Sequence, residues 1–190
     1  MKHLIFSSAI VIILILINPG FTYSNNQPAR FSSGLGIHNL MQNGETRCTK
    51  PQSDQTCFTS DLKDIDSSSF AFNLEYYTKR KLLRYLQPSF GYLGTQENAH
   101  FGYFGLSMDF FFAKCKCLVI SPSLAAGWYV DGNDIKMGNR VQFKSGGDFS
   151  YKFRNNVRIS IGLYHLSNAG LGDKNPGSET AVFKYQIPFN

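Results

Sequence analysis

Apolar residues alternate with polar or small ones through long stretches of the chain. From Val157 to Tyr164 every odd position is aliphatic, whereas the even positions hold arginine, serine, glycine and tyrosine. A period of two indicates a β-strand with one apolar face. The same pattern predicts seven further strands over residues 30–41, 69–78, 82–93, 103–112, 118–128, 141–153 and 180–189. The chain is therefore predicted to be an all-β protein of eight antiparallel strands.

The polar faces of these strands favour a membrane barrel over a soluble fold. Each strand has about the ten residues that a tilted transmembrane strand needs. The polar faces also carry charges on several strands, namely Glu75, Asp109, Lys144, Asp148, Lys152, Arg158 and Lys184. A soluble β-sandwich or lipocalin-like barrel is the alternative fold, but its core would not bury so many charges unpaired. A small outer-membrane barrel accommodates them in its polar interior.

The connections between the predicted strands alternate in length. The turns around Arg80, Lys116 and Asn155 are short, whereas residues 42–68, 131–139 and 168–178 form longer loops. Short periplasmic turns and longer external loops are typical of outer-membrane barrels. We therefore predict an eight-stranded antiparallel transmembrane β-barrel in the outer membrane of a Gram-negative bacterium.

The first residues predict export. A polar start is followed by an apolar run from Leu4 to Ile17, then by Pro19-Gly20 and small residues up to Ser24. This is the pattern of a secretory signal peptide over residues 1–24, cut after Ser24, which leaves 25–190 as one barrel domain. An N-terminal membrane anchor is the alternative, but the apolar run is shorter than the roughly 20 residues of a spanning helix.

Composition adds the expected partners and the state of the cysteines. The net charge of +6 suggests acidic partners such as nucleic acid, phospholipid or lipopolysaccharide phosphate, and no nucleic-acid motif is present. Four cysteines in an exported chain favour disulfides, and Cys48 is predicted to pair with Cys57. Cys115 and Cys117 are only two residues apart, where a bridge would be strained, so a disulfide and free thiols both stay open. No cofactor or metal site is implied, because His38 and His100 lack zinc-type spacing.

Three polar residues interrupt the predicted lipid-facing side of the last two strands. His165 and Ser167 continue the apolar parity of Leu163, and Glu179 shares the parity of Ala181. Polar groups on a lipid face need compensation, which makes them candidates for function. Serine, histidine and a carboxylate together suit nucleophilic acyl transfer, since the imidazole accepts the hydroxyl proton and the carboxylate orients the ring.

The topology predicts which leaflet these residues meet. Both termini of an even-stranded barrel lie in the periplasm, so the loop between the last two strands is expected to be external, facing lipopolysaccharide. Basic residues expected near this rim could bind the phosphates of lipid A as charge-assisted pairs. They are Arg47, Lys136, Arg140 and Lys174.

The segment Tyr164 to Glu179, YHLSNAGLGDKNPGSE, resembles the signature of the lipid A 3-O-deacylases, the PagL family of eight-stranded outer-membrane barrels. That signature has a His-x-Ser-Asn element and a glutamate fourteen residues after the histidine. The resemblance implies that His165 is the general base, Ser167 the nucleophile and Glu179 the orienting acid. It also implies that Asn168 and Gly170 supply backbone donors to the oxyanion, with Asn175 in the Asn-Pro-Gly loop supporting the site.

The resemblance extends more loosely from Gly127 to Phe153, and before that only the strand count agrees. The 42–68 loop with its cysteines and the Lys-Cys-Lys-Cys turn are not features of the family. By resemblance the chain is an esterase that removes the ester-linked 3-O acyl chain of lipid A in the outer leaflet.

Other functions stay open on the residues alone. One is a non-catalytic small barrel, an adhesin or structural protein, in which His165 and Ser167 are only rim residues. Others are a phospholipase or a lipid A acyltransferase, because hydrolysis and transfer pass through the same acyl-enzyme. The preferred acyl chain and the oligomeric state, a homodimer included, also stay open.

Overall fold

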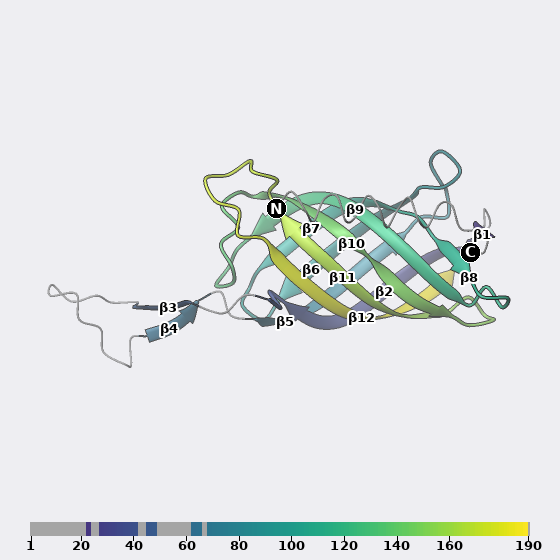
Figure 1. Cartoon of the computed structure of the whole chain (residues 1–190), viewed down its shortest axis with the longest axis horizontal. Coiled ribbons are helices and arrows are strands. Elements are labelled where there is room, and N and C mark those ends of the chain that lie inside the picture. The colour runs from purple at the N-terminus through teal and green to yellow at the C-terminus, as the bar shows by residue number, and fades with distance from the viewer. Residues whose placement is uncertain (1–21, 24–26, 42–44, 49–61, 66–67, 190) are drawn as a thin grey trace, which may run out of the picture.

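Eight strands close into an antiparallel barrel in the computed structural model, which describes residues 22–23, 27–41, 45–48, 62–65 and 68–189 (Figure 1). Each strand pairs with the next, and the last pairs with the first, so the sheet closes. The strands are 8 to 13 residues long, as a tilted membrane strand requires. In ring order they are β2 (Ala29–His38), β5 (Ser69–Tyr77), β6 (Gln87–Thr95), β7 (His100–Ser107), β9 (Leu118–Val130), β10 (Val141–Lys152), β11 (Arg158–Ser167) and β12 (Ser178–Phe189). The prediction of an eight-stranded antiparallel barrel is confirmed.

Four short strands accompany the barrel. β8 (Phe110–Phe112) pairs with the first residues of β9, so that it prolongs β7 beyond Met108 and Asp109. β1 (Thr22–Tyr23) pairs with β8. β3 (Glu45–Cys48) and β4 (Leu62–Ile65) form a separate two-stranded sheet in the connection from β2 to β5. Within the ranges given above, no helix has the length and apolarity to cross a membrane.

The third predicted strand was wrong at its start. Residues 82–86 belong to a turn closed by a bridge between Leu82 and Leu86, and β6 begins only at Gln87. Leu83 and Arg84 have φ of 48° and 67°, a left-handed conformation that an extended strand excludes. The connection predicted to be tight around Arg80 therefore spans nine residues, 78–86. The first predicted strand also ends earlier, at His38, because Asn39 has φ of 59°.

The predicted faces are confirmed. Along β11 the odd side chains Ile161 and Leu163 are more than half exposed, whereas Tyr164 and Leu166 are buried. Along β10 the buried positions include Gln142, Lys144 and Asp148, while Phe143 and Phe149 point outward. The exposed apolar side chains surround the barrel as a lipid-facing belt.

Charged residues fill the interior in pairs. Asp109 accepts hydrogen bonds from Arg30 and Arg158 at 3.2 and 2.8 Å. Glu75 binds Lys144 at 2.7 Å and Lys184 at 2.5 Å, and Lys184 also lies 3.1 Å from Asp148. Buried charges are tolerated when each has a partner. The interior is thus a packed polar core.

Tyrosines extend this network. Tyr103 donates to Glu75 at 2.7 Å, and Tyr164 donates to Asp148. The Lys144 ammonium also lies 4.0 Å from the centre of the Tyr103 ring and 4.1 Å from that of Tyr164. Such contacts rigidify the barrel wall, of which β11 and β12 are part.

Of the two alternatives for Cys115 and Cys117, the structure contains the disulfide, in the turn between β8 and β9. Cys57 lies outside the described residues, so its pairing with Cys48 stays a prediction. Apart from Thr22 and Tyr23, the predicted signal peptide also lies outside the described residues, so the peptide and its cleavage after Ser24 stay predictions.

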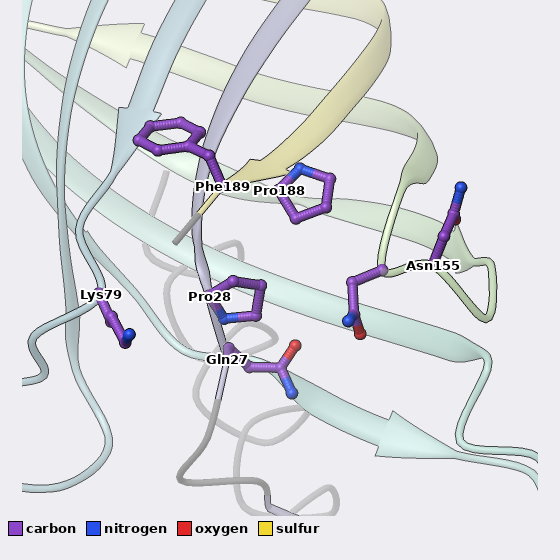
Figure 2. A pocket seen from close by; sticks show the side chains of 7 residues that line it. Gln27, Pro28, Lys79, Asn155, Pro188 and Phe189 are labelled. Carbon is purple, nitrogen blue, oxygen red and sulfur yellow. The ribbon is translucent and has the colours of Figure 1, made fainter.

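The two ends of the barrel differ. One end carries the connection containing β3 and β4 together with the loops 131–140 and 168–177; the other carries the turns 78–86, 113–117 and 153–157 (Figure 1). At the turn end a cavity of about 490 Å³ is lined by Gln27, Pro28, Lys79, Asn155, Asn156, Pro188 and Phe189 (Figure 2). This cavity is at the opposite end from His165.

Candidate active site

β11 and β12 place His165 and Glu179 directly opposite each other. The two residues are Cα partners in the antiparallel ladder, and residues so paired have Cβ atoms about 4.5–5.5 Å apart. His165 Nδ1 lies 3.1 Å from Glu179 Oε1. The two side chains are 47% and 32% exposed, so the pair is accessible from outside the barrel wall. A carboxylate on Nδ1 leaves Nε2 for a second partner.

Ser167 lies two residues beyond His165 on the same face of β11. Its Cα partner is Phe143 on β10, and its side chain is half-buried. Positions i and i+2 of a strand share a face at a spacing of roughly 6.5–7 Å. Among the residues whose positions are described, none forms a hydrogen bond with the Ser167 hydroxyl. The structure therefore brings the base and the acid together, with the serine beside them but not bonded to the imidazole.

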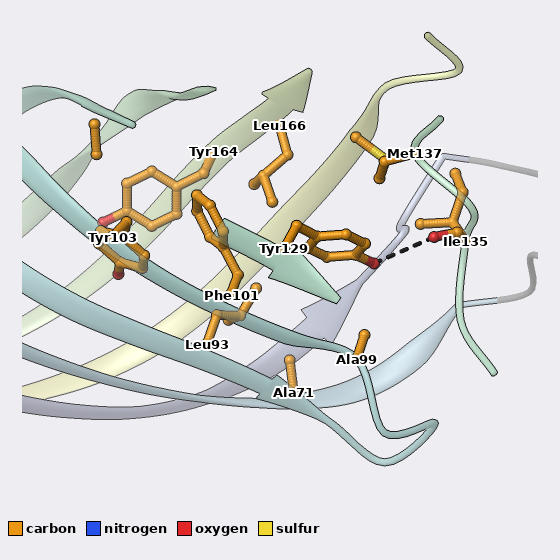
Figure 3. Packing of buried hydrophobic residues seen from close by; sticks show 11 residues of the cluster. Ala71, Leu93, Ala99, Phe101, Tyr103, Tyr129, Ile135, Met137, Tyr164 and Leu166 are labelled. Atoms are coloured by element: carbon orange, nitrogen blue, oxygen red, sulfur yellow. Dashed lines mark hydrogen bonds between the residues drawn. The ribbon is translucent and has the colours of Figure 1, made fainter. Parts of the chain in front are cut away.

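Leu166, between the two polar residues, anchors the end of β11. It is fully buried in an apolar cluster with Tyr164, Tyr129 and Met137 (Figure 3). The Tyr129 hydroxyl donates to the Ile135 carbonyl at 3.3 Å, which ties the loop 131–140 to this cluster. His165 and Ser167 therefore project from a strand end whose inward side chain is held by packing.

Gly177 packs against the imidazole of His165. A Cβ at this position would lie 2.8 Å from His165 Cε1 and 3.5 Å from Nε2, so no larger residue fits without displacing the ring. Its φ of 74° also favours glycine. The loop that precedes β12 thus forms one wall around the histidine.

Asn168 holds the loop 168–177 together. Its side chain is fully buried, and its Nδ2 donates to the carbonyls of Met137 and Lys174 at 2.8 and 2.7 Å. Asn139 Nδ2 adds a bond to the Leu171 carbonyl at 2.9 Å. The residue after the candidate nucleophile therefore fixes this loop against the loop 131–140.

The predicted oxyanion donors already have acceptors in this arrangement. The Asn168 N–H donates to Asn175 Oδ1 at 3.0 Å, and the Gly170 N–H donates to Asn168 Oδ1 at 2.8 Å. Binding an oxyanion with these groups requires the donors to be shared or the loop to rearrange. Asn175 supports the loop 168–177, because its side-chain oxygen accepts the bond from the Asn168 N–H.

A buried histidine lies behind Glu179. His38, at the end of β2, has Nδ1 2.8 Å from Thr180 Oγ1 and Nε2 3.4 Å from Ser178 Oγ. Ser178 and Thr180 flank Glu179 in β12, so these contacts hold the backbone that carries the acid. The sequence interpretation treated His38 only as a non-metal histidine. The contact of His38 with Thr180 follows from the register between β2 and β12, which the sequence does not reveal.

The basic residues predicted at this rim are found at the same end as His165. Lys136 and Lys174 are exposed on the two loops, and Arg140 lies over the Trp128 ring at 5.9 Å. Arg47 is in β3. Sequence reasoning missed the contacts of Met137 and Asn139 with the site loop, because hydrogen bonds between two loops leave no periodic signal.

The chain matches the family described as lipid A 3-O-deacylase (PagL) over residues 20–188. No curated protein matches the chain significantly.

Among solved structures, the outer membrane enzyme PagL superposes with a TM-score of 0.59 at 18% identity, covering 84% of this chain and 99% of that one. A de novo designed transmembrane β-barrel gives 0.50 at 8% identity, covering 87% and 100%. Neisserial surface protein A gives 0.47 at 11%, covering 88% and 99%. The likenesses to PagL and to the designed barrel concern the fold alone.

The family match spans nearly the whole barrel, including all three candidate residues on β11 and β12. The chain thus belongs to the PagL family of lipid A 3-O-deacylases and is a β-barrel protein of the Gram-negative outer membrane.

Proposed function

We propose that this chain removes the ester-linked 3-O acyl chain from lipid A in the outer leaflet, with Ser167, His165 and Glu179 as a catalytic triad. The single observation that supports this most is the contact of His165 Nδ1 with Glu179 Oε1 at 3.1 Å on the outer wall of the barrel. Family membership supports the substrate.

The chemistry follows from which imidazole nitrogen is available. Glu179 on Nδ1 keeps that nitrogen protonated, so Nε2 takes the Ser167 proton as Oγ attacks the ester carbonyl carbon. The tetrahedral oxyanion then collapses, and the imidazolium returns the proton to the departing 3-oxygen of the sugar. A water molecule next attacks the acyl-serine with Nε2 as base, which frees the fatty acid and restores the serine.

The missing hydrogen bond between Ser167 and His165 is compatible with this role. Catalytic hydrogen bonds are often long without substrate and tighten in the Michaelis complex. The Asn168 and Gly170 N–H groups lie in the loop that directly follows the serine, where an oxyanion would form. We assign them as its donors once their present acceptors, Asn175 Oδ1 and Asn168 Oδ1, yield or share the bond.

The position of the triad suits a lipid substrate. His165 and Glu179 continue the exposed face of Leu163 and Phe183, so an acyl chain lying along the barrel wall would reach them from the membrane. Lys136, Arg140 and Lys174, at the same end, would bind the phosphates of lipid A as charge-assisted pairs.

Mass spectrometry of purified lipid A, incubated with the detergent-solubilised protein, tests this proposal. The expected product has lost one ester-linked acyl chain from the 3 position, and a free fatty acid appears in equal amount. The Ser167→Ala protein should produce neither. Release of acyl chains from glycerophospholipids but not from lipid A would identify a phospholipase. Acyl transfer to a second lipid without free fatty acid would identify a transferase, and either result would overturn the proposal.

A further inference from the structure

The turns at the end opposite His165 form a one-sided charge pattern. The turns 78–86, 113–117 and 153–157 hold seven basic residues, four in the first, two in the second and one in the third, and no acidic residue. The four connections at the other end, 39–68, 96–99, 131–140 and 168–177, hold nine acidic and six basic residues. The basic excess of the chain is therefore concentrated at the turn end. We call these seven residues the basic collar: Lys79, Arg80, Lys81, Arg84, Lys114, Lys116 and Arg154.

An aromatic girdle lies immediately inside the collar. Tyr76, Phe112, Tyr151, Phe153 and Phe189 are at or next to strand ends on the lipid-facing side. Tyr76 and Phe189 stack with ring centres 5.7 Å apart, and Tyr151 meets Phe153 edge-on at 5.0 Å. Aromatic girdles mark the boundary between hydrocarbon and headgroups. The collar lies in the turns beyond these strand ends, on the side of the girdle away from the hydrocarbon. It is thus at the depth of the lipid phosphates.

The turn 78–86 also exposes two apolar side chains beside its basic residues. Leu83 is 80% exposed and its neighbour Leu82 is 52% exposed, within a turn that also carries Lys79, Arg80 and Arg84. Exposed leucines beside cations are typical of segments that lie at a membrane surface.

The cavity at this end has both polar and apolar residues in its lining. Lys79 and the amides of Gln27 and Asn155 form polar walls, whereas Pro28, Pro188 and Phe189 form an apolar one (Figure 2). Such a lining fits a headgroup next to the start of an acyl chain.

We propose that the basic collar binds the anionic headgroups of glycerophospholipids, of the phosphatidylglycerol type, in the leaflet opposite the candidate active site. Each Lys or Arg close to an anionic membrane surface is attracted to it, and Arg and Lys form charge-assisted hydrogen bonds with phosphate. The girdle and the exposed leucines favour a membrane lipid over an anionic glycan, because a glycan offers no hydrocarbon for them. The full-length barrel would then be held at a fixed depth by its turn end, independently of the esterase chemistry.

The test compares lipid retention by three folded proteins. The wild-type chain, a neutralised variant (Lys79→Gln, Arg80→Gln, Lys114→Gln, Lys116→Gln) and a charge-preserving variant (Lys79→Arg, Lys114→Arg, Lys116→Arg) are reconstituted in vesicles of equal phosphatidylglycerol and phosphatidylcholine. After extraction into mild detergent, native mass spectrometry counts the lipids that stay bound. Heat-modifiable gel mobility confirms that each barrel is folded. If the neutralised variant does not fold, the pair Lys114→Gln and Lys116→Gln replaces it.

Wild type and the charge-preserving variant should retain phosphatidylglycerol over phosphatidylcholine. The neutralised variant should lose this preference by about tenfold or more. Equal retention by wild type and the neutralised variant would refute the proposal, as would loss of the preference in the charge-preserving variant.

Two further arms address other anions. If the wild-type chain bound inorganic phosphate but showed no preference for phosphatidylglycerol over phosphatidylcholine, the collar would be a site for free phosphate and the proposal would fail. Sedimentation with isolated peptidoglycan sacculi, without any preference for phosphatidylglycerol, would also overturn it. Deacylation of lipid A in detergent is measured separately and should be the same for all three proteins.

Discussion

His165 and Glu179 are Cα partners across β11 and β12, and their side chains meet at 3.1 Å on the outer wall of the barrel. The register between the two strands creates this contact, and nine consecutive pairs, from Arg158–Gln186 to Leu166–Ser178, fix that register. A slip by one residue would send one of the two side chains to the other face. The ladder therefore fixes the relative position of the two residues.

Ser167→Ala and His165→Ala should each reduce lipid A deacylation by at least about 10⁴-fold while leaving a folded barrel. Both side chains lie on the outer wall and contribute little to packing. The double variant should be scarcely worse than either single variant, since residues that act as one unit are strongly non-additive. Rates of fatty acid release measure this. Full activity of Ser167→Ala would mean that an activated water attacks the ester directly.

Glu179→Ala should retain roughly 10–100-fold more activity than Ser167→Ala, because the carboxylate orients the imidazole without bonding to the acyl group. Steady-state kcat on lipid A measures the difference. Glu97→Ala in the short connection 96–99 is the matched control and should not change the rate. If Glu179→Ala were as active as wild type, its contact with His165 would have no catalytic role.

Gly177→Ala should lower kcat by about 10–100-fold, because the new Cβ, at 2.8 Å from His165 Cε1, displaces the ring from its position. The control is Gly102→Ala on β7, where a Cβ meets nothing within 4 Å and φ is ordinary. The two variants differ in site geometry and add the same methyl group. Equal rates for both would contradict the packing of Gly177 on the histidine.

Lys184→Met should destabilise the barrel by about 3–5 kcal/mol, since Glu75 and Asp148 lose their shared buried partner. Urea unfolding of the refolded protein in lipid vesicles gives the free energy. Adding Asp148→Asn should recover part of the loss, because Glu75 keeps Lys144 at 2.7 Å. If Lys184→Met alone were as stable as wild type, the buried ion pairs of Lys184 would not contribute to stability.

The period of two made the orientation of the candidate site predictable. Leu163, His165 and Ser167 share one parity, so the sequence alone predicts that they face outward, and the structure confirms it for the strand. Glu179 follows by the same rule on β12. The pairing of His165 with Glu179 was not predictable from parity, because it depends on how far β12 is shifted along β11.

The strand prediction failed where the local backbone conformation departs from that of an extended strand. Leu82, Leu83 and Leu86 resemble a strand in composition, yet the left-handed φ of Leu83 and Arg84 turns the chain instead. Contacts between loops were equally hidden, since Asn168 reaches Met137 across 31 residues of sequence. Such bonds depend on the pairing of β10 with β9 and with β11, which brings the loops 131–140 and 168–177 to the same end of the sheet.

The filled interior has a kinetic consequence. Lys184, Arg158 and Tyr164 are packed inside the wall, whereas the candidate triad opens sideways to the membrane. A substrate then arrives by diffusion in two dimensions, within a single leaflet. The reaction rate should accordingly follow the mole fraction of substrate in the surface, and diluting lipid A with inert detergent at constant bulk concentration should slow the enzyme.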